Sequence, residues 1–421
     1  MRLRRSLVAL VLAATAGTAV ATMPATAVAA VAAAPLASEV SGAGLDVTDS
    51  EQVAPGVRLE SFTSSSASAA AIQGELLTVD LRNPHVSVDL LHPPAVAQAQ
   101  RVSQMADALG AVGGVNGDFF NNTEAQHPGV AFTDSSDGPE IARGRALKAA
   151  VPNGQRFGPG MPPGVTTQAV FGVGVDGVGR LGNASLEGSV RIKSVTRPLG
   201  GLNQYAIPVG GIGAYTSAWG ATSRARSVCG TDTSRGAACS TDTTEVTLRH
   251  GKVVAVGSTV GAGAISTDET VLVGREAGAD ELRTLKVGQH VTVKYDLSTG
   301  RGVPFRFAVG GFPILENGTV VAGQDAKTAA VRTGAGFSAD GRTMFLVAVQ
   351  AAPGTSGGMT TPEVAQLLQR AGAANAVNLD GGGSTTLVAR DPGAHAVTVR
   401  NRPTDGAGER SVANGIGVFV R

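Results

Sequence analysis

The stretch TPEVAQLLQRAGAANAVNLDGGGSTTL (Thr361–Leu387) predicts an amphipathic helix that is followed at once by a buried strand. Thr361 can cap the start of the helix, Pro362 suits its first position, and Gly372 suits its end. Apolar residues at helical spacing lie on one face: Val364, Leu367, Leu368 and Ala371. We therefore expect this helix to pack on the sheet that contains the strand.

Polar residues and glycines end this strand. It closes on Asn378-Leu379-Asp380, and a glycine run comes next. A hairpin needs one or two glycines, so three in a row indicate a backbone that another group approaches closely. Successive amides in such a turn can form an anion-binding nest. The candidate ligand contacts are Gly381, Gly382, Gly383, Ser384 and Thr385.

An earlier segment has the same layout. Residues 95–109 have helical spacing, Gly110 can end the helix, and the predicted strand Ala111–Phe120 contains Asn116-Gly117-Asp118. Side chains two residues apart in a strand share a face, so each strand presents an amide and a carboxylate together. If the two strands are neighbours in one sheet, four polar groups converge.

Two carboxylates, Asp118 and Asp380, are the candidate catalytic residues. Sugar transfer uses such a pair, one group as acid or base and the other as nucleophile or stabiliser of positive charge. The alternative is that each Asp only caps a turn by accepting hydrogen bonds from nearby amides. Arg332 and Arg410 precede apolar strands and can offer a guanidinium to a phosphate, or can be solvated charges. Asn414 is a further hydrogen-bonding candidate.

Composition predicts a globular, β-rich protein. The chain has 421 residues, 43% of them hydrophobic, with 58 glycines and a formal charge of +1. This charge gives no field that would attract nucleic acid or an acidic membrane. The predicted class is α+β: a mixed-sheet catalytic domain with packed helices, in two parts (71–153 and 303–421), interrupted by a β-rich insertion lobe (154–302). Paired strands are expected at Glu75–Leu81 and Val86–Leu91, and the closing strand, Ser411–Val420, is expected in the sheet that holds both Asn-x-Asp strands.

The N-terminus predicts export. Residues 1–30 have a basic start, an apolar run and small-residue cleavage sites, as in a secretory signal peptide, and residues 31–70 are expected to be a flexible lead-in. An uncleaved anchor is the alternative, although Thr, Gly and Pro24 interrupt the apolar run. Cys229 and Cys239 are the only cysteines, and in an exported protein such a pair is most simply a disulfide. The histidines show no metal-ligand spacing, so neither a metal nor a cofactor is expected.

Five blocks of sequence resemble the phosphodiester glycosidase family. They are GGVNGDFF, VGGFPILENG, RTGAGF, NLDGGGSTTL and NRPTDGAGERSVANGIGVF, in this order from about Gly113 to Phe419. The chain departs from the family pattern at Phe312, where a more glycine-rich block is usual, and before Arg332, where His-Pro is frequent. The resemblance implies cleavage of the bond between a sugar C1 and a phosphate, as in an N-acetylglucosamine-1-phosphodiester within an envelope or extracellular glycan.

The residues fit this chemistry in defined roles. A phosphate monoester is a weakly basic leaving group, so its departure needs charge stabilisation, which Arg332, Arg410 and the glycine amides would supply. Asp380 would be the nucleophile or electrostatic partner and Asp118 the base, while Asn116 and Asn378 would orient hydroxyls or the carboxylates. Two other functions stay open: a non-catalytic glycan-phosphate binding protein and a metal-dependent phosphoesterase.

Overall fold

A computed structural model describes residues 45–69, 71–353, 357–406 and 408–421. The described residues lie in one compact unit, Val40–Arg421. The predicted signal peptide lies outside the described residues, as does the lead-in up to residue 44. Within the described residues no helix is both long and apolar enough to cross a membrane.

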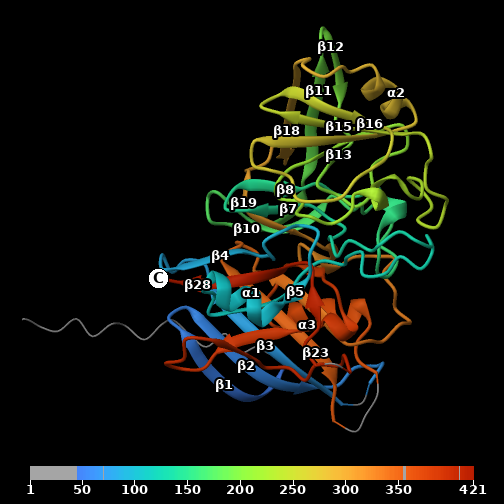
Figure 1. Cartoon of the computed structure of the whole chain (residues 1–421). Coiled ribbons are helices and arrows are strands. Elements are labelled where there is room, and N and C mark those ends of the chain that lie inside the picture. The colour runs from blue at the N-terminus through green and yellow to red at the C-terminus, as the bar shows by residue number, and fades with distance from the viewer. Residues whose placement is uncertain (1–44, 70, 354–356, 407) are drawn as a thin grey trace, which may run out of the picture. The chain divides into compact units, whose positions relative to one another are not determined.

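An eight-stranded sheet forms the base of the predicted catalytic domain (Figure 1). Every neighbouring pair in it is antiparallel, so the prediction of a mixed sheet is wrong. In spatial order its strands are β1 (Asp46–Ala54), β2 (Val57–Ser64), β3 (Ile72–Asp80), β23 (Thr343–Ala351), β22 (Arg332–Phe337), β24 (Asn375–Asn378), β20 (Phe312–Glu316) and β21 (Thr319–Val320).

A five-stranded antiparallel sheet packs against this base. Its central strand, β6, carries the first Asn-x-Asp segment, and the closing strand β28 lies between β6 and β4. The order is β26 (Val397–Val399), β25 (Leu387–Arg390), β6 (Gly113–Asn116), β28 (Gly415–Val420) and β4 (Val86–Leu91); β5 (Gln100–Arg101) and β27 (Ser411–Val412) form a separate pair. The two strands expected to pair with each other, β3 and β4, lie in different sheets because β3 pairs with β2 and β23.

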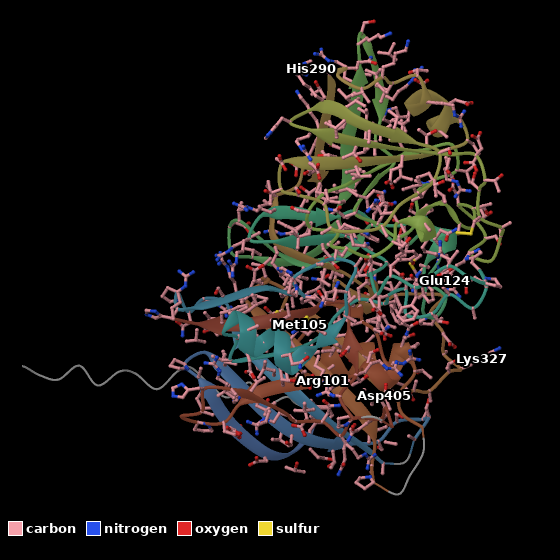
Figure 2. The ribbon with its side chains drawn as sticks, in the orientation of Figure 1. Arg101, Met105, Glu124, His290, Lys327 and Asp405 are labelled. Carbon is pink, nitrogen blue, oxygen red and sulfur yellow. A yellow bond between two sulfur atoms is a disulfide. The ribbon has the colours of Figure 1, made fainter. Side chains whose placement is uncertain are left out.

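Strand β23 of the base sheet faces helix α3 on one side and the five-stranded sheet on the other. Its side chains alternate in direction: Phe345 and Val347 pack with helix α3, whereas Leu346 and Ala348 pack toward the five-stranded sheet. Helix α1 covers the far face of that second sheet through residues such as Met105, labelled in Figure 2. The core helices are α1 (Val102–Leu109) and α3 (Thr361–Arg370).

Helix α3 begins one residue earlier than the sequence suggested. Thr360, not Thr361, caps it, in a capping box with Glu363 that satisfies two backbone amides. Helix α1 is shorter than predicted, because residues 95–99 lie in irregular structure and Gly110 ends the helix in the left-handed conformation. The two expected core helices are present, but the protein is richer in β-structure than the α+β prediction implied.

Part of the predicted flexible lead-in is ordered sheet. Residues 46–64 contain the whole of β1 and β2, so the prediction is wrong there. The reason is that β2 buries apolar side chains on both of its faces: Val57 and Leu59 pack in one core cluster, and Phe62 packs in another.

The region predicted as an insertion lobe is built from strands, as expected (Figure 1). One of its sheets joins residues inside and outside the predicted lobe: β10 (Gly179–Asn183), β9 (Ala169–Gly174), β19 (Phe305–Gly310), β7 (Glu140–Ala142) and β8 (Arg145–Lys148). The others surround helix α2 (Ala277–Arg283) and a separate apolar core: β12 (Val195–Pro198), β11 (Ser185–Ile192), β18 (Val291–Ser298), β13 (Gly201–Leu202), β14 (Ile212–Tyr215), β17 (Glu269–Arg275), β15 (Thr243–Arg249) and β16 (Lys252–Gly257).

Candidate active site

The two Asn-x-Asp segments meet, although their strands belong to different sheets. The prediction that β6 and β24 are neighbours in one sheet, together with β28, is wrong. Instead, the backbone N–H of Asp380 donates to the Gly117 carbonyl at 2.9 Å, and Asn116 Nδ2 donates to the Asp380 carbonyl at 2.7 Å. These two bonds join the ends of the strands across the interface between the sheets.

The two asparagines differ in what they leave for a ligand. Asn116 is fully buried, and its Oδ1 accepts from the Thr333 hydroxyl at 2.7 Å and from the Thr386 amide at 3.0 Å. It therefore ties the two sheets together, and both of its polar side-chain atoms already have partners within the protein. Asn378 donates from Nδ2 to the Leu379 carbonyl at 2.8 Å, while its buried Oδ1 has no partner among the described residues.

The carboxylate of Asp118 is buried, and the protein provides a hydrogen-bond donor to each of its oxygens. Its Oδ1 accepts from the Phe119 amide at 2.8 Å and its Oδ2 from the Gly138 amide at 2.6 Å, and the residue is 5% exposed. A Cβ added at Gly310 would lie 2.2 Å from Asp118 Oδ2, so glycine is required there by close approach. Asn414 positions the backbone, because its Oδ1 accepts from the Asp118 amide at 2.9 Å.

A second aspartate, Asp137, lies beside Asp118 and was not predicted. The Tyr205 hydroxyl donates to its Oδ1 at 2.6 Å, and the Phe157 amide donates to its Oδ2 at 2.8 Å. Burial raises the pKa of Asp118 to about 6 and the pKa of Asp137 to about 7, the latter also through the charge of Asp118. The stretch DSSDG around Asp137 has only the pattern of a turn, so no sequence signal distinguishes Asp137 from an ordinary turn residue.

Lys148 supplies a buried positive charge to this acidic cluster. Its Nζ donates to the backbone carbonyls of Gly138 at 2.7 Å, Ala149 at 2.9 Å and Asp137 at 3.2 Å. Burial lowers the pKa of Lys148 to about 8, and nearby carboxylates, Glu140 first, oppose that shift. The charge of Lys148 in turn favours the ionised form of Asp118.

Asp380 is the more accessible of the two predicted carboxylates. It is partly exposed, and its Oδ1 accepts from the Gly381 amide at 2.9 Å. Burial raises its pKa to about 7, with the charge of Asp118 acting in the same direction and that of Arg410 against it. Asp380 therefore titrates near neutral pH and feels both Asp118 and Arg410.

Each of the three consecutive glycines, Gly381, Gly382 and Gly383, is favoured for a different structural reason. A Cβ at Gly381 would lie 2.6 Å from the Val331 carbonyl oxygen, Gly382 has a φ of +60°, and a Cβ at Gly383 would lie 2.5 Å from an Arg410 nitrogen. The run therefore allows both a tight turn and the close approach of a guanidinium.

The predicted nest of amides is not preformed. The amide of Gly381 donates to Asp380 and that of Gly382 to the Val331 carbonyl at 2.8 Å. The Ser384 and Thr385 amides both donate back into the turn at 3.2 Å. All four donors are therefore used inside the protein, and those of Ser384 and Thr385 close the 3-10 helix over Gly382–Ser384. Ser384 and Thr385 are buried; the Ser384 hydroxyl opposes the rise of the Asp380 pKa by hydrogen bonding, whereas the Thr385 hydroxyl has no partner among the described residues.

The two predicted arginines have different surroundings. Arg410 lies over Gly383, is partly exposed, and donates from Nε to Asp405, which Figure 2 labels, at 2.6 Å. Arg332 is 5% exposed and donates to the carbonyls of Met359 at 3.1 Å and Thr328 at 2.7 Å. Arg410 therefore lies where it could contact a ligand bound at the glycine run. Arg332 is buried and instead stabilises the backbone at Thr328 and Met359.

A small cavity of about 20 Å³ adjoins Asp118. Asp118, Asp137, Arg156 and Phe312 contribute to its lining. Phe312 stacks on Phe119 with ring centroids 6.1 Å apart, and the Arg156 guanidinium lies 5.6 Å and 6.0 Å from the two rings. Because a water molecule needs about 10 to 15 Å³ of such space, the cavity is of one-water size and has polar groups to hold it.

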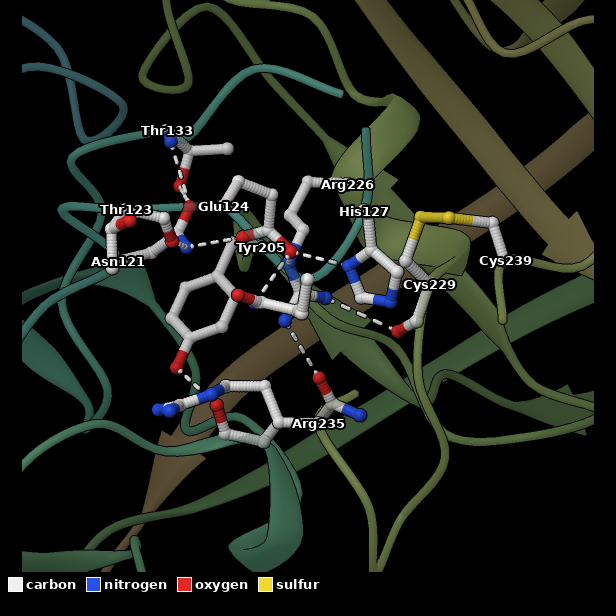
Figure 3. A network of polar contacts seen from close by, with 12 residues as sticks. Asn121, Thr123, Glu124, His127, Thr133, Tyr205, Arg226, Cys229, Arg235 and Cys239 are labelled. Carbon is white, nitrogen blue, oxygen red and sulfur yellow. Dashed lines mark hydrogen bonds and ion pairs between the residues drawn. A yellow bond between two sulfur atoms is a disulfide. The ribbon is translucent and has the colours of Figure 1, made fainter. Parts of the chain in front are cut away.

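Cys229 and Cys239 form the predicted disulfide, with an S–S distance of 1.97 Å. His127 lies close by, and Figure 3 shows it between Glu124 and the loop that the disulfide closes. Its Nδ1 contacts Glu124 Oε1 at 2.5 Å and its Nε2 contacts the Ala237 carbonyl at 2.7 Å. Within the part of the chain that the structure describes, the only group of residues spaced as metal ligands would be is His127, Cys229 and Cys239. The two sulfurs of this group are already bonded to each other.

Comparison with known proteins bears on this geometry. Residues 242–419 match the family model of the phosphodiester glycosidases. The predicted resemblance is confirmed over this region. The matched region, residues 242–419, includes Arg332, Asp380 and Arg410 but not Asp118 or Asp137. No curated protein matches the chain.

Two of the solved structures that are similar to this chain share its fold. A hypothetical protein from Synechocystis is 21% identical with a TM-score of 0.65; the match covers 87% of this chain, which spans 62% of that protein. An exported protein from Burkholderia pseudomallei is 22% identical with a TM-score of 0.62, over 84% of this chain and 75% of the other. The zebrafish N-acetylglucosamine-1-phosphodiester alpha-N-acetylglucosaminidase catalytic domain is 15% identical with a TM-score of 0.44, over 90% of this chain and 88% of the other.

The raised pKa of Asp380 predicts a pH-dependent stability difference. The ordinary value is 3.8 and the folded value is about 7, so the stabilising contribution is complete below about pH 4 and is lost as pH rises through 7. Asp380→Asn removes this loss. We expect its Tm to exceed that of the wild type by a few degrees more at pH 8 than at pH 4, measured by scanning calorimetry, since each pKa unit corresponds to about 1.4 kcal/mol. A difference that does not change with pH would contradict the raised pKa.

Proposed function

We propose that the chain is a phosphodiester glycosidase that hydrolyses the C1–O bond of a sugar-1-phosphodiester, such as an N-acetylglucosamine-1-phosphodiester in an envelope or extracellular glycan. The observation that carries the proposal is the meeting of Asp118 and Asp380 across two sheets, with Arg410 held over the adjacent glycine run. Two carboxylates beside a cation suit a reaction in which positive charge develops at a sugar carbon while a phosphate leaves.

The mechanism assigns one task to each group. Arg410 binds the phosphate oxygens, so the C1–O bond breaks with its electron pair passing to the phosphate monoester. Asp380, as a carboxylate, stabilises the positive C1 centre, or bonds to C1 to give a glycosyl ester whose bond to C1 breaks, returning the carboxylate, when water attacks C1. Asp118 takes a proton from the water whose oxygen bonds to C1. Asn414 is a positioning residue, since it holds the backbone of Asp118 and reaches Glu140 Oε1 at 2.8 Å.

The test is hydrolysis of a panel of sugar-1-phosphodiesters in water labelled with oxygen-18, with and without EDTA. The proposal expects free sugar that carries the label at C1, with a rate that EDTA does not change. Label in the phosphate together with inhibition by EDTA would instead identify a metal-dependent phosphoesterase. Binding of the donors without any sugar release would identify a glycan-phosphate binding protein.

Lys148 should set the pH dependence of this reaction. Because the ionised carboxylates are the active forms, kcat/KM should rise with pH through about 6 to 7, the pKa values of Asp118 and Asp380. Lys148→Met removes a charge that lowers the Asp118 pKa, so the rising limb should move to higher pH. The readout is the pH profile of kcat/KM. A uniform fall at every pH, with the limb unmoved, would mean that Lys148 acts only through packing.

We also propose that the protein is exported. The disulfide between Cys229 and Cys239 supports an oxidising compartment, and the N-terminal sequence supports a cleaved signal. Mass spectrometry of the native protein should find a mature N-terminus close to Ala30. An intact N-terminus with both cysteines reduced would contradict export.

A further inference from the structure

A large groove lies next to the candidate active site. It has a volume of about 560 Å³ and is lined by residues 149–153, 166–168, 199–200 and 232–233, together with Ala184, Leu186, Gln204 and Pro208. This volume is within the range of about 300 to 1,000 Å³ that is usual for ligand sites. We call it the lobe groove, because most of its lining comes from the region 154–302.

The lobe groove adjoins the cavity beside Asp118. Thr166 and Thr167 line both spaces. Thr167 is held in place, since its amide donates to Asn153 Oδ1 at 2.9 Å and its hydroxyl to the Val151 carbonyl at 2.5 Å. A ligand in the groove would thus contact two residues that also line the space at Asp118.

The charge of the lining distinguishes the lobe groove from the region above the glycine run. Of the described residues that line it, none is Lys, Arg, His or Glu, and Asp232 is the only charged one. Asp232 Oδ1 already accepts from the Val209 amide at 3.0 Å. The groove therefore offers no cation for a phosphate, whereas Arg410 lies at Gly383. This asymmetry suits a substrate with its phosphate at Arg410 and uncharged groups in the groove.

The lining contains an acceptor without a partner. Gln204 is 1% exposed, and its Nε2 donates to the Ala206 carbonyl at 2.6 Å, but its Oε1 has no partner among the described residues. A buried acceptor left unpaired costs free energy, so it indicates a donor that the protein itself does not provide. A sugar hydroxyl is such a donor.

The walls of the groove are fixed. The Gly154 amide donates to the Asp232 carbonyl at 2.9 Å, and the Ala149 amide donates to the Leu202 carbonyl at 2.9 Å. The Cys229–Cys239 disulfide closes the loop that carries Asp232 and Thr233. A groove with fixed walls loses little conformational entropy when it binds a ligand.

We propose that the lobe groove binds the neutral sugar residues of the substrate glycan that lie beyond the sugar being cleaved. The inference rests on the proposed function and names its substrate class: oligosaccharyl phosphodiesters are preferred to donors with a single sugar. Leu186 and Leu199 supply apolar contacts, and Gln204, backbone groups and threonine hydroxyls supply polar contacts for uncharged hydroxyl-bearing rings.

The test fills the groove with a bulky side chain. Leu186→Trp should raise KM for a donor whose reacting sugar carries a neutral trisaccharide by about tenfold, the equivalent of 1.4 kcal/mol, and leave kcat/KM for the single-sugar donor within about twofold. Thr233→Trp, on the exposed loop, is a second variant should Leu186→Trp not fold. Ser194→Trp, exposed between β11 and β12 and outside the groove, is the matched control.

A binding measurement separates this inference from the proposed function. Calorimetry with the phosphate-free neutral trisaccharide should show binding to the full chain that Leu186→Trp abolishes and Ser194→Trp retains. If the single-sugar donor is hydrolysed but the trisaccharide neither binds nor lowers KM, the groove proposal is overturned and the function stands. If no donor is hydrolysed but groove-dependent binding occurs, the function fails and the glycan site stands.

Discussion

Asp380→Asn should lower kcat/KM for a sugar-1-phosphodiester by about 10³-fold or more, because it removes a negative charge that acts on the developing cation at C1. The variant keeps the side-chain volume and an oxygen that can accept from the Gly381 amide, so the fold should be retained. The measurement is release of free sugar under saturating and limiting donor. Asp380 acts mainly on the charge that develops at C1 in the transition state, so kcat should fall more than KM changes.

The control for this prediction is Asp268→Asn. Asp268 is exposed and contacts Arg249 and His250 near the β15–β16 turn, in the sheet that packs on a different apolar core. Its substitution should leave turnover unchanged. Full activity of folded Asp380→Asn would remove Asp380 from the mechanism, and an equal loss in both variants would point to a general defect of the preparation.

Gly310→Ala should lower the activity of the site, although Gly310 has no side chain that could contact the substrate. The added Cβ would lie 2.2 Å from Asp118 Oδ2 and 2.8 Å from the Gly138 Cα, so the carboxylate or the backbone must move. A displacement of about 1 Å in a reacting group can cost about 100-fold in rate, and overpacking typically costs about 1 to 3 kcal/mol of stability. We expect a loss of kcat of that size and a lower Tm.

Gly160→Ala is the matched control, because a Cβ at Gly160 meets no atom within 4 Å. It should match the wild type in both rate and Tm. Wild-type turnover by Gly310→Ala would mean that Asp118 tolerates displacement, which is incompatible with its role as the base. Loss of stability without loss of rate would assign Gly310 to packing alone.

Local patterns in the sequence predicted local structure well. The helical spacing after Pro362 predicted α3. The residue pairs His250-Gly251, Asn317-Gly318 and Asp340-Gly341, which are of a kind that favours hairpin turns, each lie between two paired strands. These features depend on side-chain periodicity and on glycine conformation within a few residues, which a sequence displays directly. The disulfide was predictable because the chain has only two cysteines.

The candidate site was predictable only in part. Asp118 and Asp380 were selected because each follows an apolar strand and an asparagine, and the structure brings their backbones together. Asp137 and Lys148 were missed, since neither lies in a pattern that differs from an ordinary turn or strand end. Burial is what gives them shifted pKa values, and burial of a single polar residue depends on the packing of distant segments.

The sequence by itself determined the two core helices, the hairpins, the cysteine pair and the carboxylates that end two apolar strands. Only the tertiary structure decided that β6 and β24 lie in different sheets, that the amides of Gly381 and Gly382 donate to groups of the protein itself, and that Asp137 lies beside Asp118. The physical reason is the separation along the chain of the residues that interact. Helices and turns form from neighbours, whereas the bond from Asn116 to Asp380 joins residues 264 positions apart, and nothing local to either residue specifies its partner.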